Sequence, residues 1–274
     1  MRIELRDGLI EVPGGLPTFA SPGLETAAAR IGRIAADSYD YLARLLDRRP
    51  EAQVLVVSES DWATKTDVPL FGLPNADAGT LVVPGTEAPW WDEFASMVAE
   101  SDRAELASVY ADSEGRLHFG PFFDLVAVHE IGHLFHGDVS PFPRLWLQEL
   151  FANLCLQAWA AERAPDSLRT LLTLPRLGGT APAELFECRT RTDFETTYAA
   201  ISGPNYAWYQ FRLQMQASDL YERCGSAIVP RLFEAFRMDP GRAADESTSL
   251  DDEALAALLQ DQVDPELAAF SLAF

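Results

Sequence analysis

The sequence predicts an α+β fold, with strands in its first 120 residues and helices in most of the remaining chain. Every strand candidate precedes residue 120, whereas apolar residues after that point recur at helical spacing. At 274 residues the chain is long for one core and short for two large domains. We therefore expect a single unit of two lobes, residues 1–137 and 138–274.

The spacing of apolar residues and the positions of proline, glycine and turn residues predict the helices and strands of the first 120 residues. The segment MRIELRDGLIEV (residues 1–12) is typical of two short strands around an Asp-Gly turn. Residues 24–48 predict an amphipathic helix that ends before Pro50. Further strands are expected at residues 53–58, 80–83, 107–110 and 116–119, the last two flanking a DSEG turn.

Beyond residue 120 the pattern is almost entirely helical. Apolar residues recur at helical spacing in residues 122–135 and 146–161, which predicts two helices. The acidic stretch 244–253 is typical of a linker, and we expect one last short helix after it.

Composition limits the classes of partner and compartment. The net charge of −21, with no basic cluster longer than Arg48-Arg49, argues against nucleic acid as a partner. No apolar run approaches the eighteen residues that cross a bilayer, and the first residues do not resemble a signal peptide. Three scattered cysteines suit a reducing compartment. These features predict a cytoplasmic protein; its oligomeric state is left open.

All four histidines fall within nineteen residues, and two of them form the motif HEIGH at residues 129–133. On a helix, His129 and His133 lie one above the other, about 6 Å apart, so both imidazoles can bind one ion. Glu130 is rotated by about 100° from His129, which suits a base rather than a ligand. The alternative is a chance HExxH whose histidines are satisfied by hydrogen bonds in a buried helix.

A catalytic zinc site takes three protein ligands and one water, so a third donor is needed. His136 is a poor candidate, because residues 129–136 span about 10.5 Å of helix axis. The metzincin pattern would require Gly and a ligand where His136 and Val139 stand. The remaining candidate is Glu149, on the helix after the breaker-rich loop SPFPR (140–144). One turn later, Asn153 could accept the outer N–H of a ligating histidine.

HEIGH followed by WLQELFAN resembles the gluzincin metallopeptidases, the thermolysin and aminopeptidase N group, over about residues 122–160. The resemblance implies that His129, His133 and Glu149 bind zinc and that Glu130 is the catalytic acid/base. Fifteen residues separate His133 from Glu149, a few fewer than is usual in that family. It also implies a zincin-like arrangement of a mixed-sheet lobe and a helical lobe.

A looser resemblance covers NYAWYQFRLQMQASDLYERCG (205–225). In these peptidases a tyrosine on the corresponding helix hydrogen-bonds the oxyanion, and here Tyr206 and Tyr209 both qualify. Tyr209 is slightly favoured because of its spacing from Gly225. The family also binds an extended peptide along an edge strand above the zinc, for which residues 71–78 are the expected segment; Pro74 suits an edge.

The predicted activity is therefore zinc-dependent hydrolysis of peptide bonds. The aminopeptidase motif GxMEN is missing before HEIGH, although Glu87 or Asp77 could bind a substrate amine instead. We lean to an endopeptidase or oligopeptidase. Three alternatives remain: a regulatory metallopeptidase of the ImmA/IrrE type, which shares E-x-x-A-N but here lacks a helix-turn-helix signal; a non-catalytic scaffold that keeps its metal; and an interaction module without metal.

Overall fold

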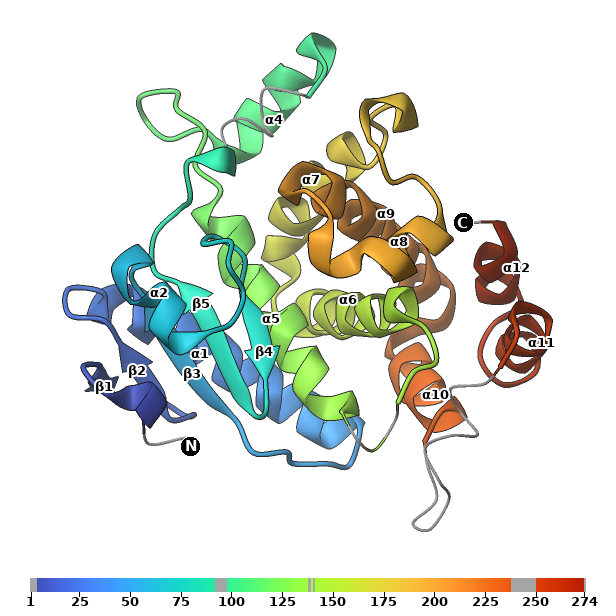
Figure 1. Cartoon of the computed structure of the whole chain (residues 1–274), viewed down its shortest axis with the longest axis horizontal. Coiled ribbons are helices and arrows are strands. Elements are labelled where there is room, and N and C mark those ends of the chain that lie inside the picture. The colour runs from blue at the N-terminus through green and yellow to red at the C-terminus, as the bar shows by residue number, and fades with distance from the viewer. Residues whose placement is uncertain (1–3, 92–97, 138, 140, 238–249, 274) are drawn as a thin grey trace. The chain divides into compact units, whose positions relative to one another are not determined.

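The computed structural model describes residues 4–91, 98–137, 139, 141–237 and 250–273 (Figure 1). Over these residues the chain has an α+β fold with a mixed sheet and mostly helical content. It divides into two compact units, Met1–Phe135 and His136–Phe274. The boundary expected from the sequence lies two residues later, after residue 137.

The first unit contains a five-stranded sheet with the order β1-β2-β3-β5-β4. β2, β3 and β5 run parallel, while β1 and β4 are antiparallel to their neighbours and form the two edges. The predicted strands at 53–58 and 80–83 are confirmed, and the expected edge segment 71–78 contains β4, one of the two edge strands. The strands are β1 (Ile10–Val12), β2 (Thr18–Ala20), β3 (Gln53–Val57), β4 (Asn75–Asp77) and β5 (Thr80–Pro84).

The two faces of this sheet have different cores. Leu55 and Val82 share one face, which also carries Phe19 and packs on Trp62 of helix α2 (Glu59–Lys65). The opposite face is covered by α1 (Glu25–Leu45), the predicted amphipathic helix, which runs behind the strands in Figure 1. A Cβ at Gly32 of α1 would lie 2.9 Å from Oγ1 of Thr18, so glycine allows this close approach.

A tight hairpin joins β4 to β5. The pairing of Asp77 with Thr80 leaves a two-residue loop, Ala78-Gly79, in which both φ angles are positive (44° and 80°). This is the pattern of a type I′ turn, which favours Asn-Gly because alanine is strained in the left-handed region.

We expect Ala78→Asn to stabilise the protein by about 0.5–1 kcal/mol, because asparagine tolerates a left-handed backbone better than alanine. Urea denaturation would measure the change, with Ala76→Asn in the adjacent strand as the control. Unchanged or lower stability in Ala78→Asn would contradict the strain inferred for this turn.

Three sequence predictions in the first unit are wrong. Residues 107–110 belong to a helix, α4 (Arg103–Tyr110), because Leu106 and Tyr110 are buried one helical turn apart. Residues 116–119 contribute only an isolated bridge between Ala111 and Leu117. Of the two strands predicted in residues 1–12, the second is present as β1. In place of the first, the described residues contain a 3-10 helix, Glu4–Arg6.

The second unit is helical over its described residues. α6 (Leu145–Arg163) is buried along nearly its whole length and packs chiefly on α9 (Gly203–Cys224), which confirms the helices predicted at 146–161 and 205–225. A helix that is buried on nearly every side is expected at the centre of a bundle. The other helices are α7 (Leu168–Gly178), α8 (Arg191–Thr197), α10 (Ile228–Ala235), α11 (Asp252–Gln262) and α12 (Pro265–Ala273).

Two helices, α11 and α12, stand where one final helix was expected. Residues 244–249 of the predicted acidic linker lie outside the described residues. Among the helices of the described part of the chain, none combines the length and apolar character that crossing a membrane requires.

Candidate metal centre

Helix α5 (Gly120–His136) contains HEIGH and confirms the helix predicted at 122–135. Two contacts three turns apart attach it to α1. Arg30 donates two hydrogen bonds to Asp124, at 2.6 and 3.0 Å, and the Phe135 ring lies 5.4 Å from that of Tyr39. These contacts hold α5 against α1 within the first unit.

His129, Glu130 and His133 form the one group of potential metal ligands that the described residues contain. One ligand atom from each residue can be chosen so that all three lie within 4.8 Å of one another. His129 and Glu130 are buried and His133 is partly exposed. The grouping arises from the helix itself, which brings residues 129 and 133 to the same face.

The spacing of the two imidazoles fits a shared ion. Their Nε2 atoms lie 3.0 Å apart, and the rings are inclined by 76°. Two nitrogens bound at about 2.0–2.1 Å to one tetrahedral zinc would be about 3.3 Å apart. Without an ion, one ring would have to donate a hydrogen bond to the other. The 3.0 Å separation fits either arrangement, a shared metal ion or a hydrogen bond from one ring to the other.

His136, the last residue of α5, has a different environment. Its ring is buried against Phe142 and Phe151, with ring centroids 5.3 and 5.8 Å away. This aromatic packing belongs to the second unit and supports the interpretation that His136 is a core residue rather than a ligand.

Glu149 lies on α6 in a stripe of buried polar residues. Glu149, Asn153 and Gln157 are spaced four residues apart along the buried, largely apolar part of the helix, and they are only 3–5% exposed. The stripe faces α9: Asn153 donates to Gln210 at 3.1 Å, and Gln157 accepts from Gln214 at 3.0 Å. Buried polar groups require such partners.

Both oxygens of the Glu149 carboxylate accept hydrogen bonds from neutral groups. Tyr198 donates to Oε1 at 2.7 Å, and the Gln210 amide donates to Oε2 at 2.6 Å. The same amide lies 2.7 Å from the Tyr206 hydroxyl. A carboxylate has about four acceptor sites, so these two bonds are compatible with its also binding a cation. The network orients the carboxylate from two directions.

Tyr198 and Gln210 were not identified from the sequence. Tyr198 lies in a 3-10 turn (Tyr198–Ala200) directly after α8, where no periodicity marks it. Desolvation is the main cause that raises its pKa well above the ordinary value, and the nearby negative charge of Glu149 adds to the shift. Tyr198 is therefore a neutral hydrogen-bond donor at physiological pH.

The surroundings of Tyr209 and Tyr206, the two candidates for the oxyanion donor, differ. Tyr209 is fully buried, and its hydroxyl donates to the backbone oxygen of Thr190 at 2.8 Å. Tyr206 instead has its hydroxyl in the Glu149 network, 3.5 Å from that of Tyr198. The slight preference for Tyr209 as the oxyanion donor is therefore replaced by a preference for Tyr206.

Tyr209→Phe and Tyr206→Phe should behave differently. The first removes a buried hydrogen bond and should cost about 1 kcal/mol of stability with little effect on catalysis. The second should lower kcat by about 10²–10³ if Tyr206 donates to the oxyanion. Chemical denaturation and steady-state kinetics would separate them, and a kcat loss confined to Tyr209→Phe would restore the original order.

Glu87, one candidate for binding a substrate amine, has partners of its own. Its Oε1 lies 2.7 Å from Nδ1 of His118 and accepts a hydrogen bond from the backbone N–H of Gly120, the first residue of α5. The negative charge of a carboxylate at this position is stabilised by the positive end of the helix dipole. Glu87 therefore caps the helix that carries HEIGH. Asp77, the other candidate, ends the edge strand β4.

No protein-family model matches this chain, and no curated protein or solved structure matches it either.

Proposed function

We propose that the protein is a zinc-dependent hydrolase of peptide bonds, with a gluzincin-type site. The observation that carries the proposal is the pair of Nε2 atoms of His129 and His133, 3.0 Å apart on one helix face with Glu130 beside them. Two imidazoles four residues apart on one helix, with a glutamate beside them to act as the base, are typical of a catalytic zinc site of the HExxH type.

His129, His133 and Glu149 would hold the metal. Two neutral imidazoles and one carboxylate leave a net charge of +1 on a zinc site, and zinc when bound acts as a Lewis acid and lowers the pKa of a water ligand toward 7. The assignment of Glu149 is supported by the resemblance of WLQELFAN and by the way Tyr198 and Gln210 hold its carboxylate. Asn153 would orient a histidine ligand through its side-chain oxygen, since its nitrogen donates to Gln210.

Glu130 would act as the general base and then as the general acid. It takes a proton from the attacking water as the new C–O bond forms at the substrate carbonyl. It then gives this proton to the leaving nitrogen as the C–N bond breaks. The Tyr206 hydroxyl would donate a hydrogen bond to the oxyanion that develops between the two steps.

The substrate would be an extended peptide. β4 is an antiparallel edge strand of the described sheet, and such an edge can pair with an added strand through backbone hydrogen bonds. Because this pairing reads the backbone rather than side chains, it suits hydrolysis of peptides or unfolded protein segments.

A library of internally quenched fluorogenic peptides tests this function. We expect cleavage by the zinc-loaded protein, loss of cleavage after treatment with a chelator, and recovery when zinc is added back. Cleavage that persists unchanged without metal would contradict the proposal, and so would a zinc-loaded protein that cleaves no member of the library.

A further inference from the structure

A pocket of about 400 Å³ lies in the second unit, outside the Glu149 network. It is formed by the loop that leads into α6, the start of α8 and the start of α11. Its size is near the lower end for sites that bind small molecules. Its lining carries two cations and two anions, which are Arg144, Arg191, Glu195 and Asp252.

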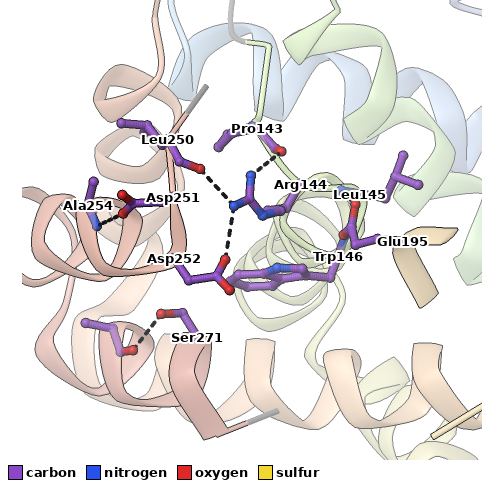
Figure 2. A network of polar contacts seen from close by, with 11 residues as sticks. Pro143, Arg144, Leu145, Trp146, Glu195, Leu250, Asp251, Asp252, Ala254 and Ser271 are labelled. Carbon is purple, nitrogen blue, oxygen red and sulfur yellow. Dashed lines mark hydrogen bonds and ion pairs between the residues drawn. The ribbon is translucent and has the colours of Figure 1, made fainter. Parts of the chain in front are cut away.

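Hydrogen bonds hold the frame of this pocket. Glu195 accepts from the backbone N–H groups of Leu145 and Trp146, both at 3.0 Å, and so caps the start of α6. Figure 2 shows Arg144 between the backbone oxygen of Leu250, at 2.8 Å, and Oδ1 of Asp252, at 3.0 Å. A ligand would therefore enter a site whose charged groups are already oriented, which reduces the entropic cost of binding.

Arg191 is the cation best suited to bind an anionic group in the pocket. Its guanidinium carbon lies over the Trp146 ring, 5.8 Å from the ring centre, which is within cation–π range. The pKa of Arg191 is lowered, chiefly because the guanidinium is partly buried, and the negative charge of Asp252 opposes this shift. A partly desolvated guanidinium gains more from a carboxylate than one in water, and its planar donors can bind both carboxylate oxygens.

The mixture of signs around the pocket determines the class of ligand. A simple anion near Arg191 would also meet the carboxylates of Glu195 and Asp252, and a simple cation would meet two guanidinium groups. A molecule with both charges close together avoids this conflict. We propose that the pocket binds a small zwitterion of the α-amino acid type, with its carboxylate on Arg191 and its ammonium group on Asp252.

Isothermal titration calorimetry with the full chain tests the proposal, using L-alanine, L-leucine, L-glutamate and L-lysine as probes. At least one should bind with a Kd below about 10 mM, a typical range for a weak small-ligand site. The N-acetyl form of the amino acid that binds lacks the ammonium group, and its amide form lacks the carboxylate. Each analogue should bind at least ~10-fold more weakly, because one charged pair is lost.

Variants locate the binding. Arg191→Gln and Asp252→Asn should each weaken the binding at least ~10-fold, and Arg191→Lys, which keeps the charge, should weaken it less. Arg189→Gln is the matched control, because that guanidinium donates to the backbone oxygen of Phe186, at 2.6 Å. Melting temperatures establish that each variant is folded.

Three outcomes would overturn the inference: no binding of any probe, equal binding of the charge-deleted analogues, or unchanged binding in both Arg191→Gln and Asp252→Asn. His129→Ala separates this site from the metal centre, since it should retain the binding. Loss of binding in His129→Ala would place the amino acid at the metal instead and would also overturn the inference, whatever the outcome for peptidase activity.

Discussion

Glu130→Gln should lower peptide hydrolysis by a factor of at least ~10² while zinc content stays the same. Glutamine keeps the size and hydrogen bonding of glutamate but cannot accept the proton of the attacking water. Steady-state kinetics on a peptide that the parent cleaves, together with metal analysis of the same sample, would measure both quantities.

Asp124→Asn is the matched control, because it makes the same carboxylate-to-amide change on the same helix. Asp124 pairs with Arg30 on the flank of α5, so this variant should lose at most about 1 kcal/mol of stability and keep its activity. Full activity in Glu130→Gln would show that another group is the base.

The second large effect concerns the third metal ligand. Glu149→Gln should weaken zinc binding by a factor of at least ~10². Loss of a residue that only hydrogen-bonds to a metal ligand already lowers metal affinity about 10–100-fold. Glutamine is preferable to alanine here, since Glu149 is buried and its volume supports the contacts with Tyr198 and Gln210. Competition with a chromophoric chelator would give the affinity.

His136→Phe provides the comparison, because phenylalanine preserves the packing on Phe142 and Phe151 while removing both ring nitrogens. Zinc affinity should stay nearly unchanged in this variant. A large loss of zinc affinity in His136→Phe with none in Glu149→Gln would contradict this assignment. It would indicate that His136, and not Glu149, is the third ligand.

The features that the sequence predicted well are local. The spacing of His129 and His133 determines their common face once the segment is helical, and the apolar pattern around them makes it helical. The strand at residues 80–83 and the long helix α1 were predicted for the same reason, because each has a clear apolar pattern over its own length.

The failures have two physical causes. Residues 107–110 form a short apolar segment whose periodicity does not separate helix from strand, and burial of Leu106 and Tyr110 decides for a helix. Tyr198 and Gln210 contact Glu149 across 49 and 61 residues of sequence. Such contacts depend on how α6, α8 and α9 pack, which no local pattern encodes.

The metal content of the purified protein tests the central claim most directly. Inductively coupled plasma mass spectrometry, after incubation with zinc and removal of the excess, should find about one zinc per chain in the parent protein. The double variant His129→Ala/His133→Ala, if folded by circular dichroism, should contain almost none. A parent protein without bound zinc, or a double variant that retains as much as the parent, would contradict the proposed metal centre.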